Sequence, residues 1–242
     1  MAYKNNKLSK VVFQINYSSI SEIKDSLLPE IIKTFETTIG VEHTKTINKS
    51  VNIIIKENST NPEYGIFTQW NFVKDPLILV INDEWIHLTT TKYVNYNAFH
   101  KLIDELLTPF ICSYTPNFNR IALRYINNIN FSRGNTFDFA NYINDSLIAP
   151  TILFKDSDLS RSMGVMVMNH NNGINTKFQY GFFNSEFPNK INKREFILDY
   201  DCSIKLNGQV DNIKKTLLDL RNNVNSLFEN SILEGFRKEL NK

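Results

Sequence analysis

The sequence has little cysteine, glycine or proline and no excess of charge of one sign. Its 242 residues include two cysteines, too few for a disulfide framework or a cysteine zinc site. Eight glycines and seven prolines leave little room for long flexible linkers, and no phosphate-binding loop or dinucleotide fingerprint occurs. Lys and Arg number 27 against 25 Asp and Glu, so a net charge of +2 gives no general affinity for nucleic acid or an anionic membrane.

Long hydrophobic runs are also missing. No segment reaches the roughly 20 apolar residues of a membrane helix, and the polar start of the chain is not followed by the apolar stretch of a signal peptide. We therefore expect a cytoplasmic protein without membrane contact. A hydrophobic content of 42% is sufficient for a core, and the length fits one large domain.

Two runs alternate apolar and polar residues with the period of two that is typical of β-strands. They are residues 120–131 and residues 196–205, and each has one hydrophobic face and one ordered polar face. The polar faces carry six side chains that we treat as a candidate binding surface: Arg120, Arg124, Asn128, Asp199, Asp201 and Lys205. Such strands indicate an open sheet with one side available for function.

The remaining pattern follows the same order twice, with no linker between. Residues 1–117 are predicted to form a β-α-β-β-β-β-α half, and residues 118–242 a β-α-β-β-β-α half. We predict an α+β fold in one continuous domain. It consists of a largely antiparallel sheet built from two similar β-α-β(3-4)-α halves, with long helices packed on one face.

The sequence also predicts where five individual helices, turns and strands begin, end or break. Pro29 should kink or divide the first helix, and residues 58–62 should form a turn. A short helix is predicted near residues 137–147 and a strand over residues 151–154. One long helix from about Val210, with Phe236 as the last residue of its apolar side, should close the chain.

Asp199 and Asp201 lie two residues apart on a strand, so both carboxylates should point to one side. Such a pair could bind magnesium, or it could form ion pairs across the sheet with Arg120, Arg124 or Lys205. The arginines, four residues apart, could instead grip a phosphate or a carboxylate. We favour ion pairing, because an isolated Asp-x-Asp pattern has little specificity.

Other chemistry-bearing residues form no recognisable set. The four histidines, at positions 43, 87, 100 and 170, lack metal-ligand spacing, and no Gly-x-Ser-x-Gly sequence occurs. We therefore predict no catalytic residues, no metal site and no cofactor.

Several blocks resemble a known family. They are residues 70–72 (WNF), 85–88 (WIHL) with Tyr93, 120–127 (RIALRYIN), 197–201 (ILDYD) and 224–232 (VNSLFENSI). In these blocks the chain resembles a sporadically distributed family of prokaryotic proteins of about this length that has no assigned biochemical role. The resemblance spans most of the chain, although the family's proline-rich opening is not matched at residues 1–10. It implies mobile bacterial genes, such as those of defence or toxin–antitoxin loci, and supplies no catalytic residues.

Three functions follow as hypotheses. The favoured one is a non-enzymatic binding or adaptor protein that acts through the polar sheet face or a helix surface. Its partner would be a protein encoded nearby or a second copy of the chain. The second is nucleic-acid binding through the same face, against which the near-neutral charge weighs. The third is a metal-dependent hydrolase that uses Asp199 and Asp201.

Overall fold

The computed structural model describes residues 3–56, 59–132, 134–152, 158–208 and 213–242, with the backbone alone for residues 50–56, 59–66 and 152. The strands are β1 (Leu8–Tyr17), β2 (Thr44–Lys56), β3 (Ser59–Lys74), β4 (Leu77–Ile81), β5 (Trp85–Thr90), β6 (Phe118–Phe131), β7 (Ser162–Asn169), β8 (Ile174–Phe182) and β9 (Arg194–Gly208). The helices are α1 (Glu22–Asp25), α2 (Pro29–Ile39), α3 (Tyr96–Tyr114), α4 (Asp145–Ile152), α5 (Ile213–Ser231) and α6 (Glu234–Leu240).

All nine described strands form one sheet, in the order β2-β3-β4-β5-β1-β6-β9-β8-β7. Every neighbouring pair is antiparallel. The α+β class and the large antiparallel sheet are therefore as predicted. The centre of the sheet is β1 paired with β6, so the two strands richest in alternating sequence, β6 and β9, lie next to each other near the middle.

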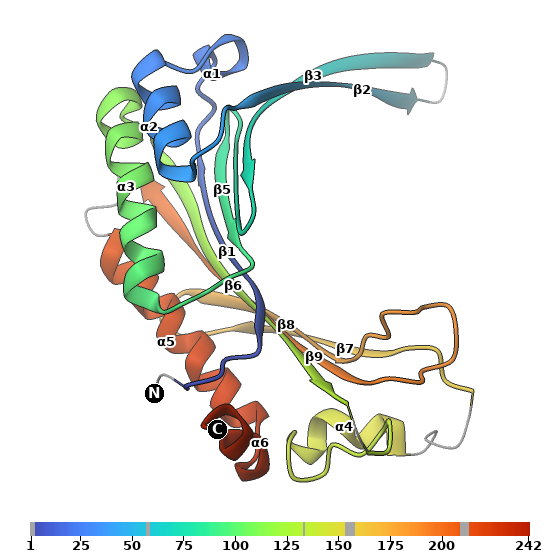
Figure 1. Ribbon diagram of the computed structural model, residues 1–242. Helices are drawn as coiled ribbons and strands as arrows, with labels where there is room; N and C mark the ends of the chain where they lie inside the picture. Colours follow the sequence, from blue (N-terminus) through green and yellow to red (C-terminus); the bar gives the residue numbers. More distant parts are fainter. Residues whose placement is uncertain (1–2, 57–58, 133, 153–157, 209–212) are drawn as a thin grey trace.

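The helices cover one face of the sheet, and Figure 1 shows α1, α2, α3, α5 and α6 on the same side. The sequence causes this layering, because alternate residues of each strand are apolar. On β1, Val11, Phe13, Ile15 and Tyr17 are at most 1% exposed and join one hydrophobic core with the helices. The apolar stripe of α3, which includes Ile103 and Phe110, packs into the same core. None of the described helices is long and apolar enough to cross a membrane.

The opposite face of the sheet carries no helix in Figure 1. The sheet curves around this side. The β2–β3 hairpin extends from one end, and β7, β8 and the connection between β8 and β9 extend from the other. The polar residues predicted to share a face therefore line the inner side of a curved sheet.

The first helix is divided as predicted. Pro29 is the first residue of α2, where its missing N–H costs no helical hydrogen bond, and α1 ends four residues earlier at Asp25. Gly40 closes α2 with φ of 76°, a conformation that glycine adopts without strain. The predicted turn over residues 58–62 is wrong for residues 59–62, because these belong to β3 and pair with β2. Residue 58 lies outside the described residues.

The short helix of the second half lies later than predicted. Only the end of the predicted range 137–147 belongs to α4, which begins at Asp145. Phe139 and Ile143 are fully buried, so their apolar spacing reflects packing of an irregular segment rather than a helix. The Asn144 side chain accepts a hydrogen bond from the backbone N–H of Ser146 at 3.1 Å and so favours a helix start at this point. Thr151 belongs to α4, which overturns the predicted strand there; residues 153 and 154 lie outside the described residues.

The closing helix is interrupted, contrary to the prediction of one long helix. Its apolar stripe continues into α6, but the chain leaves the helix after Ser231. Ile232 forms an isolated bridge with Ile143, and Leu233 N donates to Tyr142 O at 2.9 Å. These tertiary hydrogen bonds replace the helical ones and break the helix.

Candidate functional site

The face of the sheet opposite the helices, which we call the open face, gathers polar side chains from five neighbouring strands. Its central polar and aromatic side chains are Lys10, Gln14, Asn16, Trp85, His87, Arg120, Arg124, Asn128, Lys177, Gln179, Asp199, Asp201 and Lys205, and Val12, Ala122 and Ile126 lie among them on the same face. All six predicted site residues belong to this set. Tyr125 and Asn127 point to the helix side, as their register predicts, and both are 4% exposed.

The strand register decides which charges meet. Arg124 of β6 lies opposite Asp201 of β9, and Asp201 also lies opposite Lys177 of β8. Arg120 lies opposite Lys205, so two like charges are neighbours along the ladder. Direct cross-strand pairing alone would leave Asp199 opposite Ile126 without a charged partner.

Arg124 resolves this by reaching diagonally to Asp199. Its Nε donates to Asp199 Oδ1 at 2.7 Å and its Nη2 donates to Oδ2 at 2.5 Å, which is the bidentate geometry of a strong ion pair. Asp199 is only 5% exposed, whereas the Arg124 side chain is 39% exposed. The hydrogen bonds to the buried carboxylate raise the pKa of Arg124 further above its ordinary value.

Arg120 reaches diagonally in the same direction, but its contact is weaker. Its Nη2 lies 3.9 Å from Asp201 Oδ1, and both side chains are about one third exposed. The predicted ion pairing is thus confirmed for both arginines, but Lys205 does not contribute. Both carboxylates face arginines. Among the residues whose side chains are described, no group of three or more His, Cys, Asp or Glu could hold a metal ion.

Three lysines give the central part of the open face its remaining charge. Lys10, Lys177 and Lys205 are exposed, and none forms an ion pair with a described residue. Because the two arginines already compensate Asp199 and Asp201, these three ammonium groups are a local excess of positive charge. The whole-chain charge of +2 conceals this excess.

Aromatic side chains extend the open face toward the β2–β3 hairpin. Phe67, Trp85 and His87 form a row with ring centroids 6.5 Å and 6.1 Å apart. His87 Nε2 lies 2.8 Å from Thr89 Oγ1. Burial lowers the pKa of His87, and the positive charges of Lys10 and Arg124 lower it further, so this imidazole is neutral at physiological pH.

Apolar side chains extend the open face at its other end. Val165 and Val167 of β7 lie opposite Gln179 and Lys177 in the ladder and are 55% and 72% exposed. β7 is an edge strand and contains no charged residue. The centre of the open face is therefore charged, with half-buried aromatic rings on one side and exposed valines on the other.

The histidines outside the open face have ordinary structural contacts. His43 Nδ1 lies 2.8 Å from a Glu36 carboxylate oxygen, and that contact lowers the pKa of Glu36. His100 Nδ1 lies 2.9 Å from Asp104 one helical turn away. His170 Nε2 lies 3.1 Å from Thr176 Oγ1.

Sequence reasoning missed several members of the open face. Lys10, Trp85 and His87 follow the period of two of their strands. The sequence of each strand is therefore enough to predict that they lie on its polar face. Their proximity to Arg124 depends on β1 lying between β5 and β6. Val165 and Val167 are exposed because β7 is at the edge of the sheet.

Comparison with known proteins adds no assignment. Neither a protein-family model nor a curated protein sequence gives a significant match to this chain.

Proposed function

We propose that the protein is a non-enzymatic binding module whose open face receives a partner protein with an acidic surface. The observation that carries the proposal is the uncompensated positive charge of Lys10, Lys177 and Lys205 around a neutralised Arg–Asp cluster. A partner with clustered carboxylates would complement this charge and be steered toward the face.

The flanking residues supply the apolar contacts that an interface requires. Interface cores are enriched in aromatic residues and arginine, and binding energy concentrates in a few such anchors. Trp85 and Phe67 lie at one end of the open face and the exposed valines of β7 at the other. The Arg124–Asp199 pair holds the surface between them in a fixed arrangement, which lowers the entropic cost of binding.

The resemblance described above supports a place for this module in a bacterial defence or toxin–antitoxin system, with the partner encoded nearby. We also propose that residues 1–117 and 118–242 are two similar halves. The order of elements supports this: each half begins with a strand, continues with a short helical region and three or four strands, and then has a long helix, which the short helix α6 follows in the second half.

Charge reversal on the open face tests the main proposal. A tagged chain is expressed in its native host, and the proteins that copurify are identified, purified separately and titrated against it. We expect Lys177→Glu with Lys205→Glu to weaken binding of an acidic partner at least ten-fold. The matched control, Lys33→Glu with Lys214→Glu, changes the same charge at exposed helix positions and should bind normally. Equal binding by the two double variants would overturn the proposal.

Nucleic acid is a second candidate, and the aromatic row Phe67–Trp85–His87 beside the lysines favours it. Bases can stack on exposed aromatic rings while lysines contact phosphates. A gel-shift series with single-stranded DNA and RNA at increasing salt decides this candidate, because phosphate contacts weaken steeply as salt increases. No shift at low salt excludes nucleic acid, whereas a salt-sensitive shift that is lost in Trp85→Ala supports it over a protein partner.

A further inference from the structure

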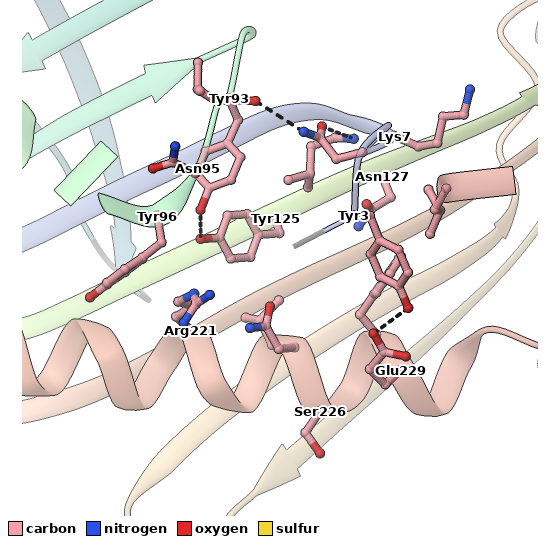
Figure 2. A pocket seen from close by; sticks show the side chains of 17 residues that line it. Tyr3, Lys7, Tyr93, Asn95, Tyr96, Tyr125, Asn127, Arg221, Ser226 and Glu229 are labelled. Atoms are coloured by element: carbon pink, nitrogen blue, oxygen red, sulfur yellow. Dashed lines mark hydrogen bonds between the residues drawn. The ribbon is translucent and has the colours of Figure 1, made fainter. Parts of the chain in front are cut away.

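A separate cavity lies on the helix side of the sheet. Residues 3–8 of the N-terminal segment, the β5–α3 connection and α5 enclose it, and Tyr125 and Asn127 of β6 contribute to its lining (Figure 2). Its volume is about 260 Å³. None of its lining residues belongs to the open face, so it constitutes an independent site.

Two tyrosine hydroxyls meet at this cavity. Tyr93 Oη lies 3.1 Å from Tyr125 Oη, and Figure 2 shows this contact as a dashed line. Burial raises the pKa of both tyrosines, so both hydroxyls keep their hydrogens. One of the two hydroxyl hydrogens forms the hydrogen bond between Tyr93 Oη and Tyr125 Oη. The other has no acceptor among the described residues and is available to a ligand.

Arg221 of α5 supplies a positive charge beside these hydroxyls. Its guanidinium carbon lies 4.8 Å from the centre of the Tyr96 ring, and its charge acts on Tyr93, Tyr96 and Tyr125. Among the described residues, no carboxylate pairs with it and no acceptor receives a hydrogen bond from its five N–H groups. A partly buried guanidinium without a counter-ion favours an anionic ligand.

The acidic residue of the cavity does not compensate Arg221. Glu229 Oε2 accepts a hydrogen bond from Arg237 Nε at 3.0 Å, and its Oε1 accepts one from the Tyr3 hydroxyl at 2.7 Å. Glu229 is thus neutralised by a different arginine. Lys7 is exposed, and Figure 2 shows its side chain directed away from the tyrosine pair, so Arg221 is the positive charge that faces the cavity.

The rest of the lining specifies the uncharged part of the ligand. The aromatic rings of Tyr3, Tyr96 and Phe228 and the aliphatic side chain of Val224 supply apolar surface. Asn127 is 4% exposed, and its Oδ1 has no hydrogen-bond donor among the described residues, so it can accept from a ligand. At about 30 Å³ per water, the cavity holds the volume of about nine waters, which suits a single ring with one small substituent.

We propose that this cavity binds a small anion that carries one aromatic ring, with the carboxylate or phosphate group on Arg221 and on the free hydroxyl hydrogen of the Tyr93–Tyr125 pair. The ring packs among the tyrosines. The inference does not depend on the function of the open face, because it uses different residues on the opposite side of the sheet.

Calorimetric titration of the full chain with four probes tests the proposal. Benzoate and phenyl phosphate present the two anionic groups, benzamide is a neutral analogue of the same shape, and acetate lacks the ring. We expect at least one aromatic anion to bind at least ten-fold more tightly than benzamide or acetate. The stronger of benzoate and phenyl phosphate identifies the anionic group. If neither aromatic anion binds, or if benzamide binds equally well, the proposal is wrong.

Two variants assign binding to the cavity. Arg221→Gln should weaken the anion at least ten-fold and leave benzamide unchanged, whereas Lys214→Gln removes one charge elsewhere on α5 and should have no effect. The double variant Tyr93→Phe with Tyr125→Phe keeps both rings and removes both hydroxyls, so it should weaken the anion several-fold even if Arg221→Gln fails to fold. Unchanged affinity in this double variant, or in a folded Arg221→Gln, would overturn the assignment.

Discussion

Arg124 and Asp199 form a bidentate ion pair that crosses diagonally between two central strands, with N–O distances of 2.7 and 2.5 Å. The carboxylate is buried and the guanidinium is half-exposed. The pair is therefore asymmetric: removal of the arginine leaves a buried charge, whereas removal of the aspartate leaves a hydrated one.

This asymmetry predicts the cost of substitutions. Arg124→Met should lower the free energy of unfolding by about 1–3 kcal/mol, because the Asp199 carboxylate loses two hydrogen bonds in a buried position. Arg120→Met removes the weaker, exposed contact and should cost about 0–1 kcal/mol. Urea denaturation measures both. Asp199→Asn should be milder than Arg124→Met, and equal costs for these two variants would contradict the asymmetry.

His87 should make stability depend on pH. The pKa of His87 is lowered by burial and by the charges of Lys10 and Arg124. At pH values between this lowered pKa and the ordinary pKa of about 6.5, the unfolded chain therefore binds more protons than the folded chain. The contribution of His87 to stability is complete above about pH 6.5 and is lost as pH falls through that window. His87→Gln should flatten this part of the profile in urea denaturation, whereas His170→Gln controls for loss of an imidazole. A profile unchanged by His87→Gln refutes the prediction.

The two cysteines should differ in reactivity. Cys112 is exposed on α3, whereas Cys202 is fully buried and its Sγ lies 3.2 Å from Thr176 Oγ1. Burial raises the pKa of Cys202 to about 11, so at pH 8 only about one thiol in a thousand would be ionised. A disulfide reagent should titrate one thiol in the native protein and two in denaturant. The native Cys112→Ser variant should contain no thiol that reacts rapidly with the reagent. Rapid reaction of Cys202 in that variant would be inconsistent with its buried position.

Gly181 should tolerate no side chain. Its φ is 135°, and a Cβ there would lie 2.1 Å from the backbone oxygen of Ser162 on β7. Gly173 also has positive φ, 81°, but a Cβ there would meet nothing closer than 3.8 Å. Gly173→Ala should therefore show only the backbone strain of about 1–3 kcal/mol, and Gly181→Ala should cost more because β7 must also shift. Thermal unfolding of both variants compares them, and equal melting temperatures would argue against the clash.

β7 should favour self-association at high protein concentration. It is an uncharged edge strand with two well exposed valines, which is the pattern of an edge open to pairing with another chain. Val167→Lys should reduce association measured by light scattering, whereas Leu218→Lys adds the same charge on α5 and should not. A chain that stays monomeric at every concentration would disprove this expectation.

The strand faces of the open face could be predicted from the sequence, because a period of two places Arg120, Arg124, Asp199 and Asp201 without knowledge of the fold. The partner of each charge could not. Arg124 bonds Asp199 rather than the directly opposite Asp201, which depends on the register between β6 and β9 and on the diagonal reach of the side chain.

Helix boundaries failed where tertiary contacts decided them. Phe139 and Ile143 have the spacing of a helix but are buried by neighbouring rings and by the bridge to Ile232. The same bridge divides α5 from α6. The cavity was equally invisible to pattern analysis, because Tyr93, Tyr125 and Arg221 belong to three elements that only the fold brings together.

The strand order has a consequence for synthesis of the protein. The strands on one side of the β1–β6 junction, β1 included, all come from residues 8–90, and those on the other side from residues 118–208. The first five strands can therefore pair while the ribosome is still translating the rest. Until β6 emerges, one edge of β1 has no partner, and the nascent chain presents that edge to chaperones or to other nascent chains.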